Sequence, residues 1–200
     1  MKLRITVILL AVTLLTVGYT LAQSSIFTEF TGHDYFFGFD PTAGTIICPG
    51  GEPTGAFPPC TPGSRVHTRD GKFFYHFEAS DPRLTGIMEL TANGNFDGWI
   101  EELFGPGSGQ MWGTMQVEVA VKGGTAEEPT WTPTGDVWEG TWTGTRTVTG
   151  TVVVITTHNV LFGTEGSVEG LKAEFSGTAD PNVSGNFQGW ILAPPGKSRK

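Results

Sequence analysis

Apolar and polar residues alternate with a period of two along several stretches of the chain, as they do in β-strands with one buried face. In the clearest case Met115 shares a face with the valines at positions 117, 119 and 121. The stretches with this strand character are residues 115–122, 137–146, 151–160 and 170–179. No window keeps the 3.6-residue period of an amphipathic helix, so the sequence predicts an all-β protein.

One of these stretches favours a barrel. Along residues 137–146 tryptophan and glycine share a face, in the order Trp138, Gly140, Trp142 and Gly144. Small barrels often alternate large and small inward side chains, and glycines inside strands mark the bends that closure requires. We therefore predict a single antiparallel β-barrel of about eight or more strands, with a β-sandwich as the alternative.

The stretch SRVHTRDGKFFYHFEAS, residues 64–80, predicts a β-hairpin, because Asp70-Gly71 is a strong signal for a two-residue turn. The register would pair Arg69 with Lys72. Alternation then places on the core face Val66, Thr68, Phe73, Tyr75, Phe77 and Ala79. On the opposite face it gathers Arg65, His67, Arg69, Lys72, Phe74, His76 and Glu78.

This polar face holds the candidate catalytic residues, which are His76, Glu78, Arg65 and His67. In an enzyme, His76 with Glu78 would act as general base and partner, and Arg65 or Arg69 would hold an anionic group. The alternative is a solvated outer face, where the charged side chains of an antiparallel sheet ordinarily lie. We favour the solvated face unless loops cover it.

A seven-residue sequence occurs twice with one change, as GNFDGWI at residues 94–100 and GNFQGWI at 185–191. No sustained match extends beyond these copies and a preceding Asp-Pro. Asn-Gly or Ser-Gly favours a turn, and Phe-x-Gly-Trp-Ile is typical of a strand whose glycine leaves room for an aromatic ring. We interpret the repeat as one hairpin pattern used twice.

Residues 1–22 have the features of a secretory signal peptide, with Lys2 and Arg4 ahead of an apolar run and a small-residue cleavage site. We expect one β-barrel domain at residues 23–195 and a disordered basic tail at 196–200, in a secreted or periplasmic protein. Acidic residues outnumber basic ones by 20 to 12, which disfavours nucleic acid as a partner. No second apolar run is long enough to span a membrane.

Cys48 and Cys60 bracket a segment rich in proline and glycine. In an exported chain this pattern predicts a disulfide that pins the loop. Two thiols without a nearby pair of histidines do not suit a metal ion. We therefore expect neither a metal nor a cofactor.

The candidate ligand-binding residues are Trp131, Trp138, Trp142 and Tyr75. Trp131 lies in the polar, Pro-containing segment 125–136, which predicts a loop that exposes the ring or folds it over the barrel end. The other three are expected to line the barrel interior. Aromatic faces suit an apolar molecule or a sugar ring.

The segments VWEGTWTGTRTVTG and HNVLFGTEGSVEGLKAEFSG resemble the small exported β-barrels grouped with allene oxide cyclase and dirigent proteins. The resemblance spans roughly residues 80–190, and it includes a Gly-Thr-x-Gly turn at 163–166 and a Gly-Leu strand start at 170–171. It implies a calycin-like barrel and brings a cyclase or isomerase into consideration. No catalytic residue of these families matches a position here, so none is carried over.

The function predicted from the sequence is that of an exported binding module, which holds a small apolar ligand in the barrel or a glycan at its mouth. One alternative is a cyclase or isomerase that uses the His/Glu/Arg face. The other is a structural or surface-interaction protein with a filled barrel. The first two need a cavity and the third needs none.

Overall fold

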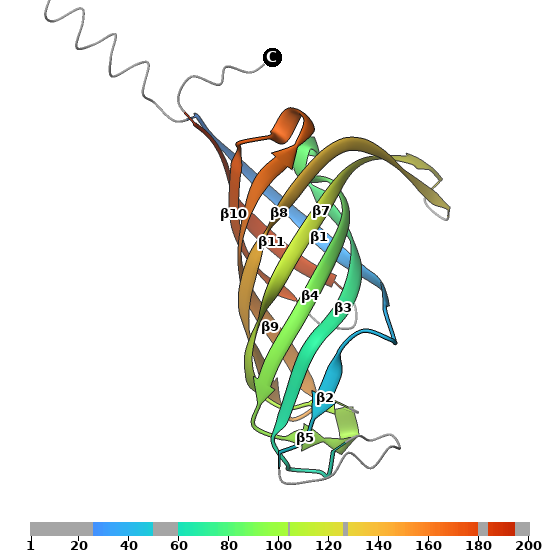
Figure 1. Cartoon of the computed structure of the whole chain (residues 1–200), viewed down its shortest axis with the longest axis vertical. Helices are drawn as coiled ribbons and strands as arrows, with labels where there is room; N and C mark the ends of the chain where they lie inside the picture. Colours follow the sequence, from blue (N-terminus) through green and yellow to red (C-terminus); the bar gives the residue numbers. More distant parts are fainter. Residues whose placement is uncertain (1–25, 50–59, 104, 126–127, 180–183, 195–200) are drawn as a thin grey trace, which may run out of the picture.

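The computed structural model describes residues 26–49, 60–103, 105–125, 128–179 and 184–194 (Figure 1). The predicted leader at residues 1–22 and the basic tail at 196–200 lie outside this part of the chain. The strands are β1 (Ile26–Phe39), β2 (Thr45–Ile47), β3 (Val66–Ala79), β4 (Gly86–Phe96), β5 (Trp99–Ile100), β6 (Gly105–Pro106), β7 (Gly109–Gly124), β8 (Pro129–Thr149), β9 (Val152–Glu165), β10 (Lys172–Ala179) and β11 (Ser184–Ala193). The short 3-10 turns are η1 (Pro82–Leu84), η2 (Glu101–Leu103) and η3 (Gly166–Val168). Among the described residues, no helix has the length and apolarity that crossing a membrane requires.

The strands close into an antiparallel β-barrel (Figure 1). Eight strands make the wall, in the order β1, β11, β10, β9, β8, β7, β4 and β3. The wall closes because β1 pairs with β11 along Ile26–Tyr35 and with β3 along Gly32–Phe39. The short strand β2 continues beside β3 where β1 has left it. The predicted barrel is confirmed, and the alternative sandwich is wrong.

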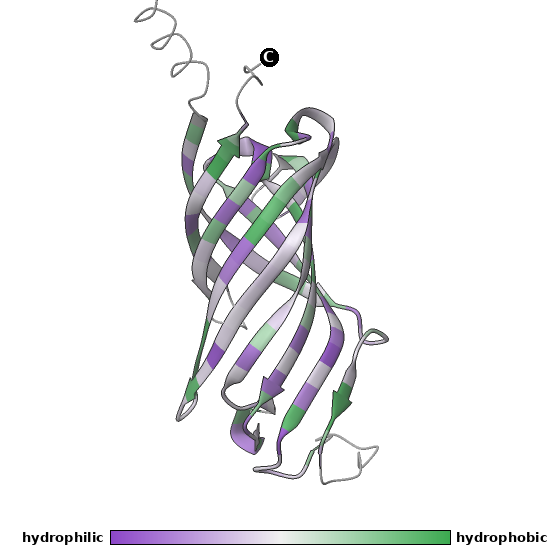
Figure 2. Cartoon of the chain, turned by 60° about the vertical axis from the view of Figure 1, so that its left-hand side comes forward, coloured by the Kyte–Doolittle hydropathy of each residue, from purple (hydrophilic) through white to green (hydrophobic). Residues whose placement is uncertain are grey.

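The predicted strands agree with the structure. They fall within β7 and β8 and, apart from one or two residues at their starts, within β9 and β10. Figure 2 shows hydrophilic and hydrophobic segments alternating along the wall. On β8, Trp138 and Trp142 are buried in the interior. Glycine is required beside them, because a Cβ on Gly140 would overlap the carbonyl oxygen of Val160, and one on Gly113 would press on the Trp142 indole nitrogen.

The Asp70-Gly71 pair forms a β-bulge, so the predicted two-residue turn and its hairpin register are wrong. β3 runs unbroken through the pair, and its register against β4 shifts there, so that Arg69 and Asp70 together oppose Asn93. Asp70 has a left-handed backbone, with φ at 55°, and its amide donates to the Asn93 side-chain oxygen at 3.2 Å. Pairing with β4 on one side and with β1 and β2 on the other outweighs the local turn preference.

The two faces predicted for this segment nevertheless agree with the structure. A two-residue turn and a one-residue bulge both shift the inward–outward alternation by one position, so that odd-numbered residues before them share a face with even-numbered residues after them. The assignment of residues to the two faces is therefore the same whichever one forms. Val66 packs inside the barrel, and the other five residues of the predicted core face line an internal cavity.

The two copies of the GNFxGWI sequence adopt different structures. The first copy ends β4, bends and then forms β5, whereas the second runs uninterrupted through β11. Asn93-Gly94 lies inside paired strand β4, so the turn expected there is wrong. The expected role of the glycine within Phe-x-Gly-Trp-Ile holds in the second copy, because a Cβ on Gly189 would overlap Phe175, but not in the first, where a Cβ on Gly98 would meet only the Gly63 backbone at 3.7 Å.

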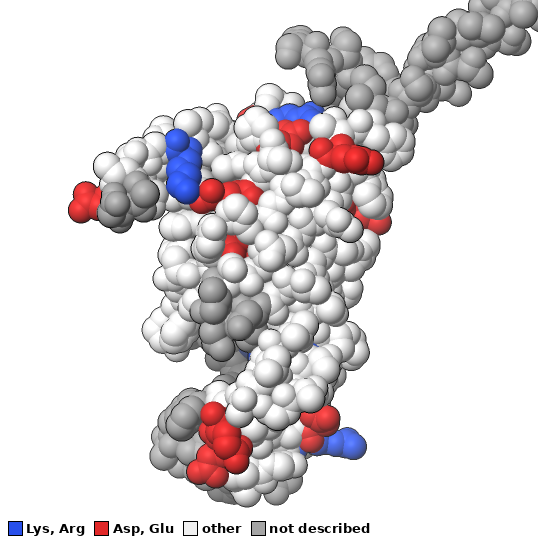
Figure 3. Space-filling model, turned by 180° about the vertical axis from the view of Figure 1, so that it is seen from behind, with Lys and Arg blue, Asp and Glu red and all other residues white. Residues whose placement is uncertain are grey.

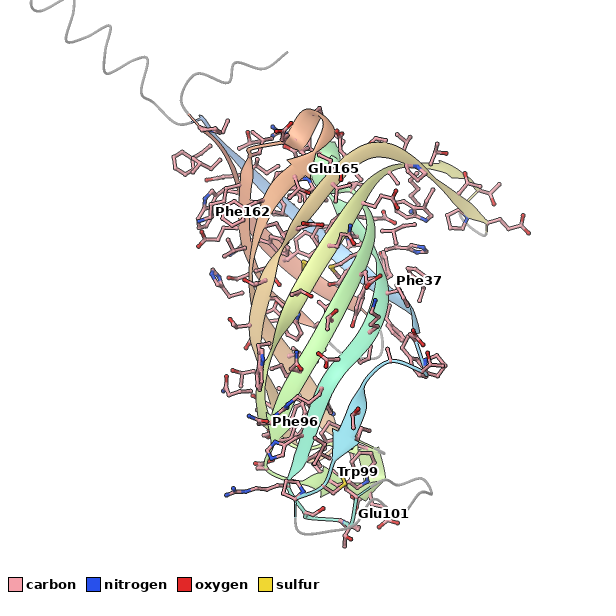
Figure 4. All side chains as sticks on the ribbon, in the orientation of Figure 1. Phe37, Phe96, Trp99, Glu101, Phe162 and Glu165 are labelled. Atoms are coloured by element: carbon pink, nitrogen blue, oxygen red, sulfur yellow. A yellow bond between two sulfur atoms is a disulfide. The ribbon has the colours of Figure 1, made fainter. Side chains whose placement is uncertain are left out.

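The barrel has one filled half and one half that contains space. Beside η1 and η3, Leu84, Trp138 and Val168 are all 0% exposed within a large apolar cluster. A smaller cluster lies at the opposite end, and it consists of Cys48, Cys60, Val66, Phe96 and Trp99. Figure 4 shows Phe96 and Trp99 at that end. We refer to the β5–β6 pair, together with the disulfide, as the cap.

The predicted disulfide between Cys48 and Cys60 is present, with Cα atoms 5.6 Å apart. Such a bond persists in an oxidising compartment. Both cysteines belong to the same buried cluster as Trp99 and Phe96. The disulfide therefore ties the chain that follows β2 and the chain that precedes β3 to the cap.

Candidate functional site

A cavity of about 640 Å³ occupies the barrel between the large apolar cluster and the cap. Its inner end is lined by Phe77, Phe175 and Phe187, and its outer end by Phe96 and Trp99. The remaining lining is also mainly apolar. This volume and this lining are typical of small-molecule sites.

Stacked phenylalanine rings form the inner end. Phe77 and Phe187 are parallel, with ring centroids 4.3 Å apart. Phe175 lies 5.4 Å from each of them, and Phe30 packs edge-on against Phe175 and Phe187. These packed rings form the floor of the cavity, and close packing of this kind disfavours rearrangement of the side chains.

Exposed apolar side chains surround the opening. Phe39 and Ile46 line the cavity and are still 59% and 39% exposed, while Val152 at the start of β9 is 62% exposed. Pairing of β9 with β10 begins only at Ile155, so among the described residues the first part of β9 bonds to β8 alone. The cavity thus reaches the surface beside the ends of β1, β2 and β9. Figure 3 shows that charged side chains gather mainly toward the two ends of the described rear surface.

Asp34 and Tyr75 form one polar region of the lining. Asp34 Oδ1 accepts a hydrogen bond from the Gly185 amide at 2.7 Å. Burial raises the pKa of Asp34, although the Gly185 hydrogen bond and the charge of His33 oppose this effect. The pKa of Tyr75 is also raised, first by burial and then by the charge of Asp34, so the phenol stays a hydrogen-bond donor.

Arg146 and Asn159 supply further polar groups. Arg146 is 9% exposed, and its Nε donates to the Pro106 carbonyl of the cap at 3.0 Å. Burial lowers the pKa of its guanidinium. Asn159 is 2% exposed and donates at 3.2 Å to both the Phe175 carbonyl and the Thr157 hydroxyl.

The candidate catalytic residues lie away from this cavity, on the outer face of β3. Glu78 bonds Lys122 of β7 at 2.6 Å and lies 3.8 Å from His33. His67 bonds the Asn95 side chain at 2.6 Å, and Arg65 is exposed just before β3. The structure does not gather the four candidates around a common cavity.

His76, the fourth candidate, lies between two aromatic rings on this outer face. Its ring is 4.4 Å from Phe37 and 4.8 Å from Trp131, and Figure 4 shows Phe37 on the outside of the barrel. The low hydration of this position depresses the pKa of His76; Glu78 opposes the shift and Lys122 adds to it. This arrangement is an aromatic stack rather than an acid–base pair.

Trp131 belongs to β8, so the loop predicted around it is wrong from Pro129 onward. There β7 and β8 extend beyond the wall as a two-stranded arm (Figure 1). The Trp131 ring packs on His76 and lies 5.8 Å from Lys122 Nζ. Trp131 therefore anchors the arm to the outer wall and does not cover the barrel end.

The other ligand-binding candidates divide between the two halves of the barrel. Trp142 and Tyr75 line the cavity, whereas Trp138 lies in the filled half. Trp142 Nε1 donates to the Thr91 carbonyl at 3.0 Å, and Trp138 Nε1 donates to the Arg83 carbonyl at 2.7 Å. Both indoles are thus fixed in position, and only Trp142 is placed to contact a bound molecule.

Reasoning from the sequence missed the polar groups of the cavity, namely Asp34, Arg146 and Asn159. Arg146 had a signal, because it continues the inward alternation of Trp138 and Trp142 along β8. Asp34 and Asn159 had none, since a polar residue on a strand gives no indication of which face it occupies. Among the described residues, no group of three or more His, Cys, Asp or Glu side chains is arranged to hold a metal ion.

Comparison of the chain with protein-family models, with curated protein sequences and with solved structures found no match. The barrel fold therefore rests on the strand pairing described above.

Proposed function

We propose that this protein is an exported β-barrel binding protein that holds a small apolar molecule in the half of its barrel next to the cap. The observation that carries the proposal is the cavity of about 640 Å³ with its mainly apolar lining. Burial of apolar ligand surface in such a space supplies about 25 cal/mol per Å² of driving force. Its inner end of packed aromatic rings and its apolar rim further support a binding role.

Export is supported by the signal-peptide features of residues 1–22 and by the Cys48–Cys60 disulfide. A glycan site built on Trp131 has less support, because its ring packs against His76. An enzyme built on His76, Glu78 and Arg65 also has less support, because these residues do not line the cavity. The filled barrel of the structural alternative does not account for the space between the two clusters.

The proposal is tested with 1-N-phenylnaphthylamine, an uncharged apolar fluorophore that accepts energy from tryptophan. The oxidised, full-length secreted protein is titrated with this probe, and native mass spectrometry gives the stoichiometry. We expect saturable one-to-one binding and quenching of tryptophan emission, because Trp142 lies in the cavity wall. Absence of saturable binding would contradict the proposal.

Two matched variants locate the bound probe. Ala92→Phe adds a ring to a buried residue of the lining, and Thr141→Phe adds the same ring to an exposed position on β8. We expect Ala92→Phe to weaken probe binding at least tenfold, because the ring occupies ligand space, and Thr141→Phe to leave it unchanged. Equal binding by the two variants would place the probe outside the barrel.

A further inference from the structure

Arg146 is a buried cation in the wall of an apolar cavity. It follows Trp142 and Gly144 on the inward face of β8, and 91% of its surface is removed from solvent, since it is 9% exposed. It lines the same space as the phenylalanine floor. A cation in such a position is costly unless a counter-charge or several hydrogen-bond acceptors surround it.

No such counter-charge comes from the described part of the protein. Arg146 Nε donates to the Pro106 carbonyl at 3.0 Å, and none of the ion pairs formed by the described residues includes Arg146. Arg83 gives an internal comparison, because its Nε and Nη2 bind the two carboxylate oxygens of Asp81 at 3.0 and 2.6 Å. Within the described part of the chain, Arg83 is therefore paired with a carboxylate and Arg146 is not.

Asp34, the acidic residue in the described lining of the cavity, does not neutralise Arg146. Asp34 is held by the Gly185 amide, and its charged neighbour is His33. Burial lowers the pKa of the Arg146 guanidinium, in keeping with the absence of an ion pair to this residue among the described side chains. The cavity thus has a cationic position beside the cap and a separate polar region at Asp34 and Tyr75.

We propose that Arg146 binds the carboxylate of an amphiphilic ligand whose hydrocarbon chain fills the apolar remainder of the cavity. A guanidinium presents parallel N–H groups that match the two oxygens of a carboxylate. The hydrogen bond from Nε to the Pro106 carbonyl orients the group, and in the proposed complex the Nη atoms bind the ligand. This inference rests on the proposed function and specifies its ligand class as long-chain carboxylic acids.

The test compares dodecanoate with dodecan-1-ol, which has the same chain length and no charge, at pH 8. Each ligand displaces 1-N-phenylnaphthylamine from the wild-type protein. We expect dodecanoate to bind at least tenfold more tightly, because only its head group pairs with Arg146. Equal affinities, or tighter binding of the alcohol, would overturn the inference even if no variant were made.

Three variants assign the difference to one residue. We expect Arg146→Met to reduce the affinity for dodecanoate about 10- to 100-fold and to leave dodecan-1-ol unaffected, whereas Arg146→Lys retains part of the preference. Arg65→Met removes the same charge from outside the barrel and should change neither affinity. A dodecanoate affinity that Arg146→Met leaves unchanged refutes the role of Arg146.

The failure of this inference is distinguishable from that of the proposed function. If the probe and dodecan-1-ol bind but Arg146→Met does not alter dodecanoate binding, the apolar cavity stands and the carboxylate site falls. If no probe binds to the wild-type protein, the proposed function fails, and the inference fails with it. Thermal melting of Arg146→Met checks its fold, and we expect a Tm no lower than wild type because the variant removes a buried charge that no described carboxylate neutralises.

Discussion

The Cys48–Cys60 disulfide gives a prediction whose magnitude follows from the chain itself. The bond joins residues separated by 12 positions. In the chain-entropy model, closing a loop of this length in the unfolded state stabilises the fold by about 3 kcal/mol at 25 °C. Replacing both cysteines with alanine removes little packing, since each loses only one sulfur atom. The entropic contribution should therefore dominate the effect.

The assay is urea denaturation of the wild-type protein and of the Cys48→Ala/Cys60→Ala variant, followed by both tryptophan fluorescence and circular dichroism. We expect the free energy of unfolding to fall by about 3 kcal/mol, with a somewhat larger m-value because the unfolded chain expands. Wild-type protein under a non-thiol reductant serves as the control and should match the variant.

A loss below about 1 kcal/mol would refute this reasoning, because the loop-closure entropy alone predicts more. The position of the bond gives a second readout. Since both cysteines belong to the same buried cluster as Trp99 of the cap, we expect the variant to release 1-N-phenylnaphthylamine faster than the oxidised wild type.

Three further perturbations test the cavity, the wall and the arm. Because the pKa of Asp34 is raised in the fold, ionisation of this carboxyl costs the wild-type protein stability as the pH rises above the ordinary value of 3.8. The free energy of unfolding of Asp34→Asn should therefore exceed that of wild type at pH 7 and equal it below pH 3.8, as urea titrations at several pH values would show. A difference that does not change with pH contradicts the assignment. Gly140→Ala should lower the Tm strongly because its methyl group meets the β9 backbone, whereas Gly38→Ala, which has no atom within 4 Å of its Cβ position, should not. Trp131→Ala should cost about 0.5–1.5 kcal/mol of stacking and raise the pKa of His76 toward its ordinary value in an NMR titration, since the covering ring is lost. An unchanged His76 pKa would show that Trp131 does not shield it.

Local pattern determined the strands and their faces. The two-residue period of β8 predicts that Trp138 and Trp142 are buried, and both are. The glycines beside them predict a wall in which backbones approach closely, which the geometry at Gly140 confirms. These features are readable because side-chain alternation is a property of a single strand and needs no knowledge of its neighbours.

The turn predictions failed where strands are long. Asp70-Gly71 and Asn93-Gly94 are strong local turn signals, yet one forms a bulge and the other lies within β4. Hydrogen bonding to neighbouring strands along the whole length of β3 and β4 outweighs a two-residue preference. Only the assembled barrel decides that competition, because the partners come from distant parts of the chain.

The site could not be located from the sequence. Which inward residues pack together and which line a cavity depends on how the phenylalanine floor and the cap divide the interior. Arg146 was readable as an inward residue, but whether a carboxylate pairs with it depends on distant charged groups, and none of those described does so. The sequence by itself therefore determined the strands, their faces and the disulfide, which depend on local chemistry and spacing. The tertiary structure alone decided the bulge, the cavity and the burial of Arg146, because each of these arises from contacts between residues far apart in the chain.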